Sequence, residues 1–247
     1  MKAHLLQIDI LWHDKPGNRA KVSHLLDRTE LSHADLAILP EMFDTGFSFH
    51  VEHTADADGA TLRFLQNQAR SRSIYIYGSR TARRGGHAMN LMSLIDPQGS
   101  ILLEYEKVHP FGLGAPGERE SDHFPGGSTV ACSTWNTPAG SLKVCPAICY
   151  DLRFPELFRR GLLAGAEMFV VPANWPAVRA AHYRALLIAR AIENQAFVIG
   201  VNRVGKDPRV SYAGQSVVVS PTGEVLGEMG DREGVLSVEI DPMLVRE

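Results

Sequence analysis

Cys149 stands at the point where a strand pattern gives way to a helix pattern. Residues 142–148 alternate in the manner of a buried strand, and Pro155 opens a helical run soon after them. Ligands of α/β proteins bind in the crevice outside the carboxyl ends of the strands. A thiol in that position is well placed to act as a nucleophile if a nearby group removes its proton. The alternative for Cys149 is an inert packing role, which is common for cysteines in strands.

Glu41 and Lys107 also follow predicted strands closely, at residues 34–39 and 100–105. A carboxylate placed straight after a buried strand loses part of its hydration, which raises its pKa and suits it to move protons near neutral pH. The alternatives are a surface or helix-capping role for Glu41 and a solvated strand end for Lys107. The residue types alone leave both interpretations open.

The chain has 247 residues, of which 45% are hydrophobic and 21% are charged, and this composition suits an α/β fold with a sizeable core. We expect a single domain across residues 1–247. The formal net charge of -3 and the lack of a basic stripe argue against a nucleic-acid binder. No run approaches the ~18 apolar residues of a membrane span, and the opening residues are too short and interrupted for a signal peptide. The sequence therefore predicts a cytoplasmic protein that binds neither nucleic acid nor membrane.

The three cysteines do not form a disulfide framework. If Cys145 and Cys149 share one strand, about 13 Å separates their Cα atoms, whereas a disulfide requires less than ~7 Å. This separation also disfavours a thiol redox sensor, which needs a resolving cysteine near the reactive one. Neither the cysteine spacing nor the histidine spacing matches a metal site, so we expect no bound metal.

Hydrophobic periodicity and turn residues predict strands that alternate with helices and are interrupted by hairpins. The Pro- and Gly-rich residues 108–128 form a long loop, and loops of this length are usually functional or disordered. The pattern indicates an α/β fold with a mixed sheet, or two sheets, and helices outside. The predicted helices are 16–28, 60–70, 155–164 and 177–195, and the remaining strands are 4–10, 73–79, 89–95, 167–172, 196–201, 215–219, 224–226 and 235–240.

Three segments together resemble the nitrilase superfamily of carbon–nitrogen hydrolases: residues 39–48 (LPEMFDTGFS), 105–111 (YEKVHPF) and 148–156 (ICYDLRFPE). They bring Glu, Lys and Cys in the order and spacing of that family. Residues 172–179, 189–195 and 201–205 resemble the ω-amidase branch more than the nitrile hydrolysers. The resemblance covers nearly the whole chain.

The resemblance implies a four-layer α-β-β-α sandwich that pairs into a homodimer or larger oligomer. It implies that Cys149 attacks an amide carbonyl and forms a thioester, while Glu41 moves the proton to the leaving ammonia and later activates water. Lys107, with the backbone N–H of Tyr150, would stabilise the oxyanion, and such donors contribute about 3–4 kcal/mol each. No metal or organic cofactor is implied.

The family also carries a second glutamate in the loop after the lysine. Glu120 and Glu118 are the candidates, and we favour Glu120 because it stands just before residues 123–127 (HFPGG). The resemblance further implies an extended tail that crosses to a partner subunit after the last strand, whereas this sequence stops soon after it. The sequence therefore does not predict which segments form the subunit contacts.

Arg153, four residues after the cysteine, is the candidate for binding a substrate carboxylate, because a guanidinium holds a carboxylate through two hydrogen bonds. This role suits a dicarboxylic acid monoamide such as 2-oxoglutaramate or succinamate. The alternative is a structural ion pair of Arg153 with Asp151 or Glu156.

Phe43, Phe47 and Trp175 are expected to line the pocket with Tyr150, although aromatic residues are more often part of the core. His109 is expected to be structural. The competing functions are hydrolysis of another carbon–nitrogen substrate (an N-carbamoyl amino acid, a nitrile or a deaminated peptide) and a catalytically silent binding module. The presence of the Glu, Lys and Cys together argues against the silent module.

Overall fold

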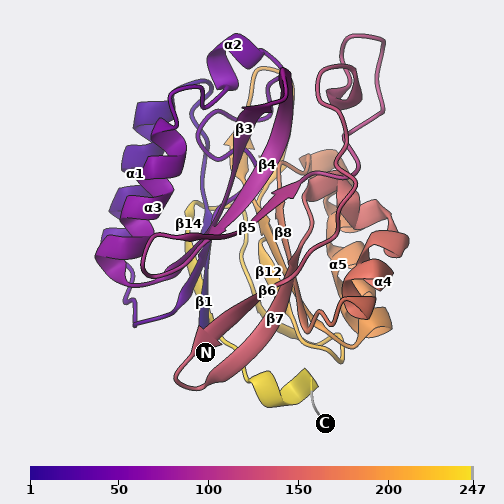
Figure 1. Ribbon diagram of the computed structural model, residues 1–247. Coiled ribbons are helices and arrows are strands. Elements are labelled where there is room, and N and C mark those ends of the chain that lie inside the picture. Colours follow the sequence, from indigo (N-terminus) through magenta and orange to yellow (C-terminus); the bar gives the residue numbers. More distant parts are fainter. Residues whose placement is uncertain (246–247) are drawn as a thin grey trace.

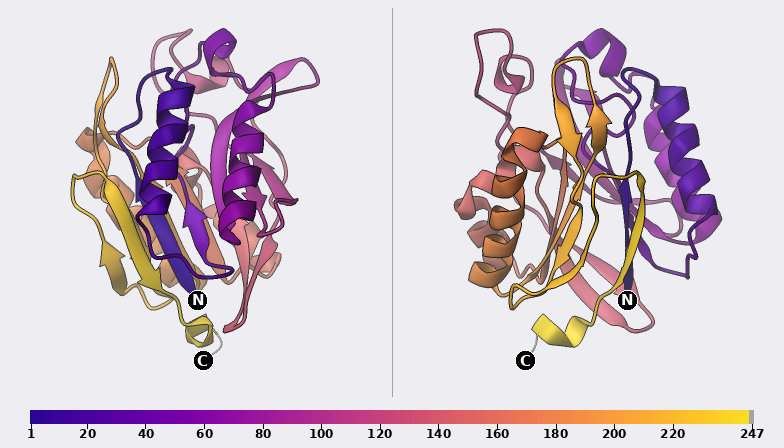
Figure 2. Two further views of the ribbon diagram at one scale, coloured as in Figure 1. Left: turned by 90° about the vertical axis from the view of Figure 1, so that its left-hand side faces the viewer. Right: turned by 180° about the vertical axis from the view of Figure 1, so that it is seen from behind.

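Two six-stranded sheets lie face to face, and helices cover the outer face of each (Figures 1 and 2). The computed structural model describes residues 1–245, and the chain end at residues 246 and 247 lies outside the described residues. The expected four-layer α-β-β-α sandwich is confirmed. The outer layers are formed by α1 (Lys15–Asp27) and α3 (Ala60–Arg72) on one side and by α4 (Pro155–Leu163) and α5 (Ala180–Asn194) on the other.

The first sheet has the strand order β14-β1-β2-β3-β4-β5. Its middle strands β1, β2 and β3 run parallel, whereas β14, β4 and β5 join by antiparallel pairing. The expected hairpin of β4 and β5 is present. The strands are β1 (Lys2–Gln7), β2 (Leu36–Ile38), β3 (Tyr75–Arg84), β4 (His87–Ile95), β5 (Ile101–Glu106) and β14 (Gly234–Glu239).

The second sheet has the order β13-β12-β9-β8-β7-β6, with β7, β8 and β9 parallel. Because helices cover one face and the other sheet covers the opposite face, such strands are apolar along their length. Every residue of β8 and β9 is buried. The strands are β6 (Ser133–Thr137), β7 (Gly140–Pro146), β8 (Met168–Ala173), β9 (Phe197–Asn202), β12 (Val217–Val219) and β13 (Val225–Glu228).

Several short elements, and the second half of β3, were not predicted from the sequence. β6 lies at a sheet edge, and Trp135 is its only fully buried residue, so it shows no apolar alternation. β3 continues past residue 79 because a hairpin at residues 85 and 86, both glycines with positive φ, pairs it with β4. The other unexpected elements are α2 (Val51–Thr54), the hairpin of β10 (Val204–Lys206) and β11 (Ser211–Ala213), and the terminal 3-10 helix at Pro242–Val245.

The main hydrophobic core lies between the two sheets and takes side chains from both. Trp135 crosses this layer, and its indole N–H donates to the carbonyl of Ala34, which precedes β2, at 2.8 Å. The segments that follow β2, β5, β7 and β8 meet at one end of the sandwich, where hydrogen bonds join them to one another. Within residues 1–245, no helix combines the length and apolar character that a membrane span requires.

Candidate active site

The segment after β7 turns sharply at Cys149. This residue has a φ of +46°, in the left-handed region that non-glycine residues rarely adopt, and it begins a 3-10 helix at Cys149–Arg153 that leads into α4. Such a conformation costs about 1–3 kcal/mol and persists only where the surroundings impose it. The strand-to-helix turn expected around Cys149 is therefore present, and its strain points to a functional position.

Asp151 fixes this turn. One carboxylate oxygen accepts hydrogen bonds from the backbone N–H of Ile148 at 2.9 Å and the hydroxyl of Tyr105 at 2.7 Å. The other accepts the backbone N–H of His109 at 2.8 Å and lies 2.8 Å from its Nδ1 atom. The His109 ring also stacks on Phe154, with 3.7 Å between centroids. Asp151 thus joins the cysteine turn to the segment after β5, and His109 has the structural role that we expected.

Lys107 lies between two carboxylates inside the protein. Its Nζ atom is 2.7 Å from Glu41 Oε1 and 2.7 Å from Glu120 Oε2, and all three side chains are fully buried. Burial opposes the charge of Lys107, but Glu120 and Glu41 outweigh it and raise the pKa of the ammonium. Burial, reinforced by the charge of Glu41, raises the pKa of Glu120, with Lys107 acting in the opposite direction. The structure therefore brings together Glu41, Lys107 and Glu120.

The Cys149 thiol is electrostatically coupled to this cluster. Burial, reinforced by the charge of Glu41, raises the pKa of the thiol well above its usual range. Lys107 and a hydrogen bond from the backbone N–H of Asn174 act in the opposite direction. Because the thiol is held in its protonated form, a nucleophilic role requires a base that removes the proton during the reaction.

Two asparagines that the sequence analysis missed hold the glutamates. Asn90 Nδ2 donates to Glu41 Oε1 at 2.7 Å and to Glu120 Oε1 at 3.0 Å, and its Oδ1 accepts from Ser79 Oγ at 2.8 Å. The backbone N–H of Asn174 donates to Glu41 Oε2 at 2.9 Å, and its Nδ2 to the Glu41 carbonyl at 2.6 Å. For Asn90 the available signal was an amide within the mostly apolar strand β4, and for Asn174 it was the position directly after β8.

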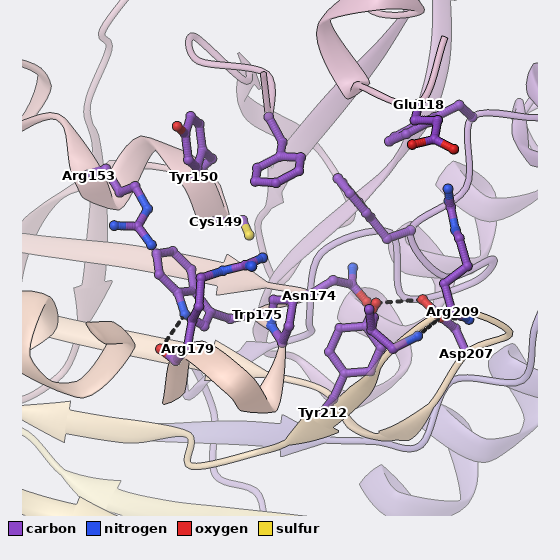
Figure 3. Close-up of a pocket in the computed structure, with 15 residues that line it drawn as sticks. Glu118, Cys149, Tyr150, Arg153, Asn174, Trp175, Arg179, Asp207, Arg209 and Tyr212 are labelled. Carbon is purple, nitrogen blue, oxygen red and sulfur yellow. Dashed lines mark hydrogen bonds between the residues drawn. The ribbon is translucent and has the colours of Figure 1, made fainter. Parts of the chain in front are cut away.

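A pocket opens over Cys149 (Figure 3). Four of the residues expected at the substrate site line it: Phe47, Tyr150, Arg153 and Trp175. The expectation for Phe43 is wrong. Phe43 is fully buried in the cluster beneath α1 and α3, where its ring stacks on Phe64 at 6.3 Å between centroids.

Arg153 lies over the Trp175 ring, with 5.0 Å from its central carbon to the ring centroid. Its Nη2 atom is 3.3 Å from His182 Nδ1. Within residues 1–245 it forms no salt bridge with Asp151 or Glu156, so the ion-pair alternative is wrong. Glu118 does not join the lysine cluster but lines the pocket as an exposed residue.

No group of His, Cys, Asp and Glu side chains in the described part of the chain has an arrangement that would hold a metal ion. The three cysteines are free, and the Cys132 thiol donates to the carbonyl of Gly161 at 3.8 Å. The side chains around Cys149 are suited to acid–base and nucleophilic chemistry of their own.

Comparisons with known proteins place these residues in a family context. The carbon-nitrogen hydrolase family model matches residues 2–247. A 2-oxoglutaramate amidase of Bacillus subtilis is 36% identical over 239 residues, which cover 96% of this chain and 89% of that protein. The omega-amidase YafV of Escherichia coli is 32% identical over 249 residues, which cover 100% of this chain and 92% of that protein.

Solved structures agree with the sequence comparison. XC1258 from Xanthomonas campestris, a CN-hydrolase superfamily protein, matches with a TM-score of 0.88 and 32% identity over 100% of this chain and 92% of that chain. An amidase from Nesterenkonia sp. matches with a TM-score of 0.88 and 27% identity over 100% of this chain and 92% of that chain.

The segment that carries Glu41 also contains a buried carboxyl group whose ionisation opposes folding. Asp44 Oδ2 accepts from Thr61 Oγ1 at 2.6 Å, whereas Oδ1 has no hydrogen-bond partner among residues 1–245. Burial raises the pKa of Asp44 to about 6 from its ordinary value of 3.8. The folded state therefore binds this proton more tightly than the unfolded state, and the stability due to Asp44 falls as the pH rises from about 4 to about 6.

We expect Asp44→Asn to remove this pH dependence, because the amide carries no charge to bury. The free energy of unfolding of the variant minus that of the wild type should increase by about 2–3 kcal/mol from pH 4 to pH 7.5. This size follows from about 1.36 kcal/mol per unit of pKa shift. Urea unfolding at a series of pH values measures the difference. A difference that stays constant with pH would contradict the assignment to Asp44.

Proposed function

Because this chain belongs to the carbon–nitrogen hydrolase family, we propose that the buried cluster is the active site of a cysteine amidohydrolase that releases ammonia from the ω-amide of a small dicarboxylic acid monoamide. The chain is a hydrolase of carbon–nitrogen bonds other than peptide bonds. The observation that carries the proposal is Lys107 held at 2.7 Å from both Glu41 and Glu120, coupled to the Cys149 thiol beneath a pocket.

In the first half of the reaction, Glu41 takes the proton of the Cys149 thiol as the sulfur attacks the amide carbonyl. The carbonyl oxygen becomes an oxyanion, which Lys107 and the backbone N–H of Tyr150 stabilise. Glu41 then gives its proton to the amide nitrogen, the carbon–nitrogen bond breaks, and ammonia leaves a thioester on the sulfur. The carboxylate of Glu41 is well oriented for this transfer because Asn90, Lys107 and Asn174 hold its two oxygens.

In the second half, Glu41 takes a proton from water as the water attacks the thioester, and it returns this proton to the Cys149 sulfur as the carbon–sulfur bond breaks and the acid product leaves. Glu120 keeps Lys107 charged and in place for both half-reactions, because its Oε2 atom also accepts the backbone N–H of Phe111 at 2.7 Å. The chemistry uses no metal and no organic cofactor, since the nucleophile, the base and the oxyanion donors are all side chains or backbone groups.

Arg153 and the relatives support the substrate class. The guanidinium of Arg153 lines the pocket beside Tyr150 and Trp175 without a carboxylate partner among the described residues. A substrate carboxylate would complete this pairing through two charge-assisted hydrogen bonds. The Bacillus subtilis relative is a 2-oxoglutaramate amidase, and the same class of amide has the required carboxylate.

The chain forms a single domain that assembles into a homodimer or larger oligomer in the cytoplasm. Leu163, Val178 and Ile192, which are 88%, 86% and 53% exposed, place apolar side chains around the outer helices α4 and α5 and support association. A thiol nucleophile suits a reducing compartment. The net charge of -3 supports a small-molecule partner rather than nucleic acid.

Ammonia release from a panel of amides tests the function. We expect turnover of 2-oxoglutaramate and succinamate and little turnover of glutamine, an N-carbamoyl amino acid or a simple nitrile. Cys149→Ala and Glu41→Gln should each reduce turnover by at least about 1,000-fold, as loss of a nucleophile or its base does elsewhere. The matched control is Cys132→Ala, which removes a thiol away from the site and should keep near-normal rates.

Near-normal rates in either active-site variant would contradict the mechanism. Activity on the carbamoyl compound or the nitrile alone would keep the cysteine mechanism and reject the substrate class. No activity on any member of the panel would favour a silent binding module.

Asn90 is expected to act as a positioning residue for the two glutamates. Asn90→Ala removes the hydrogen bonds that orient the carboxylates of Glu41 and Glu120. We expect kcat to fall about 10–100-fold with little change in KM, the range for a lost hydrogen bond to a charged group. The exposed Asn136→Ala is the control. An unchanged kcat in Asn90→Ala, or a loss confined to KM, would contradict this positioning role.

A further inference from the structure

Arg179 brings a second guanidinium into the pocket. It ends the 3-10 helix at Ala177–Arg179, between β8 and α5, and its backbone carbonyl accepts the indole N–H of Trp175 at 2.8 Å. Its side chain reaches from this turn towards the middle of the pocket (Figure 3). The guanidinium lies 5.7 Å from the Phe111 ring centroid, and it has no hydrogen bond or salt bridge within the part of the chain described.

Arg179 and Arg153 lie around one group of aromatic rings. Arg153 is 5.0 Å from the Trp175 ring centroid and 5.9 Å from that of Tyr150. Tyr150 in turn contacts Phe111, with 5.2 Å between ring centroids, and Arg179 lies over Phe111. The pocket over the thiol therefore holds two half-buried cations, and neither has a carboxylate partner among the described residues.

The acidic groups of the pocket do not neutralise this pair. Asp207 already accepts the hydroxyl of Tyr212 at 2.6 Å and the backbone N–H groups of Arg209 and Val210 at 2.7 and 2.8 Å. In Figure 3, Asp207 lies with Glu118 and Arg209 on the side of the pocket away from Arg153 and Tyr150. The part of the pocket that holds these two guanidinium groups, neither paired with a carboxylate among the described residues, is therefore strongly cationic.

A single carboxylate satisfies one guanidinium through two hydrogen bonds, which leaves the second available for another acceptor. The ω-amide of a 2-oxo acid has such an acceptor, because its ketone oxygen adjoins the carboxylate. A 2-amino acid has an ammonium at the same carbon. That group donates hydrogen bonds and repels both guanidinium groups, and this repulsion is strong where water is partly excluded.

We propose that Arg179 and Arg153 form a two-arginine clamp that selects ω-amides of 2-oxo acids and rejects ω-amides of 2-amino acids such as glutamine. Arg153 holds the carboxylate, and Arg179 donates to the 2-oxo oxygen. This inference rests on the proposed function and assigns Arg179 as a specificity-determining residue of that site.

Steady-state kinetics with matched substrates test the clamp. The substrates are 2-oxoglutaramate, glutaramate (the same chain without the 2-oxo group) and glutamine. Arg179→Gln should lower kcat/KM for 2-oxoglutaramate by about 30-fold, mainly by raising KM. A loss of this size is typical of a removed hydrogen bond to a charged group. For glutaramate the change should stay within about threefold, since that substrate makes no such bond.

Two further variants separate the roles. Arg153→Gln should weaken both 2-oxoglutaramate and glutaramate, because both have the carboxylate. Arg179→Glu should raise the kcat/KM for glutamine relative to 2-oxoglutaramate, because the new carboxylate attracts the ammonium. Arg184→Gln, on α5 in an exposed ion pair with Glu228, is the control and should leave all rates unchanged.

Equal losses on 2-oxoglutaramate and glutaramate in Arg179→Gln, or no loss on either, would overturn the clamp while leaving the amidohydrolase intact. A binding measurement distinguishes failure of the clamp from failure of the proposed amidohydrolase function. Cys149→Ala should bind 2-oxoglutarate at least about tenfold more tightly than glutarate in calorimetric titration. Adding Arg179→Gln should remove that preference. Its persistence in the double variant would overturn the clamp even if the wild type hydrolysed no amide.

Discussion

The buried pairing of Lys107 with Glu41 and Glu120 is the interaction on which the rest of the site depends. Three charges removed from water are tolerated only when they are paired and their remaining hydrogen-bonding positions are filled. Asn90, Asn174 and the backbone of residue 111 supply those hydrogen bonds. The long segment after β5 is therefore held in place by the same glutamate that keeps the lysine charged.

The two-sheet architecture explains how residues distant in the sequence meet. Glu41 follows β2 and Lys107 follows β5 in one sheet, whereas Cys149 follows β7 and Asn174 follows β8 in the other. Both sheets thus contribute polar groups to the site, and these groups meet because the two sheets lie face to face. The positive φ of Cys149 is imposed by Asp151, whose carboxylate joins the two halves through Tyr105 and His109.

The sequence was sufficient for the features that depend on local pattern. Polar residues after apolar strands marked Glu41, Lys107 and Cys149 as candidates, and only the family resemblance joined them into one predicted site. Alternation with turn residues predicted most strands and the four long helices. Phe43 was assigned wrongly because residues 39–48 contain two phenylalanines, and only the packing of α3 against one of them separates core from pocket. Asn90 and Asn174 were missed because their contacts with Glu41 span 49 and 133 residues of sequence, which no local pattern records. β6 was missed because an edge strand with one buried side chain has no periodicity to detect.

In the proposed mechanism Cys149 forms a thioester with the acyl part of an ω-amide, while Lys107 and the two glutamates support the transfer. Mass spectrometry of peptides from protein that was acid-quenched during turnover of 2-oxoglutaramate and then digested tests this intermediate most directly. We expect a transient adduct on the peptide that contains Cys149, with the mass of the substrate less ammonia, which disappears as the substrate is consumed. Ammonia release with no adduct at any quench time, or an adduct on Cys132 or Cys145 instead, would contradict it.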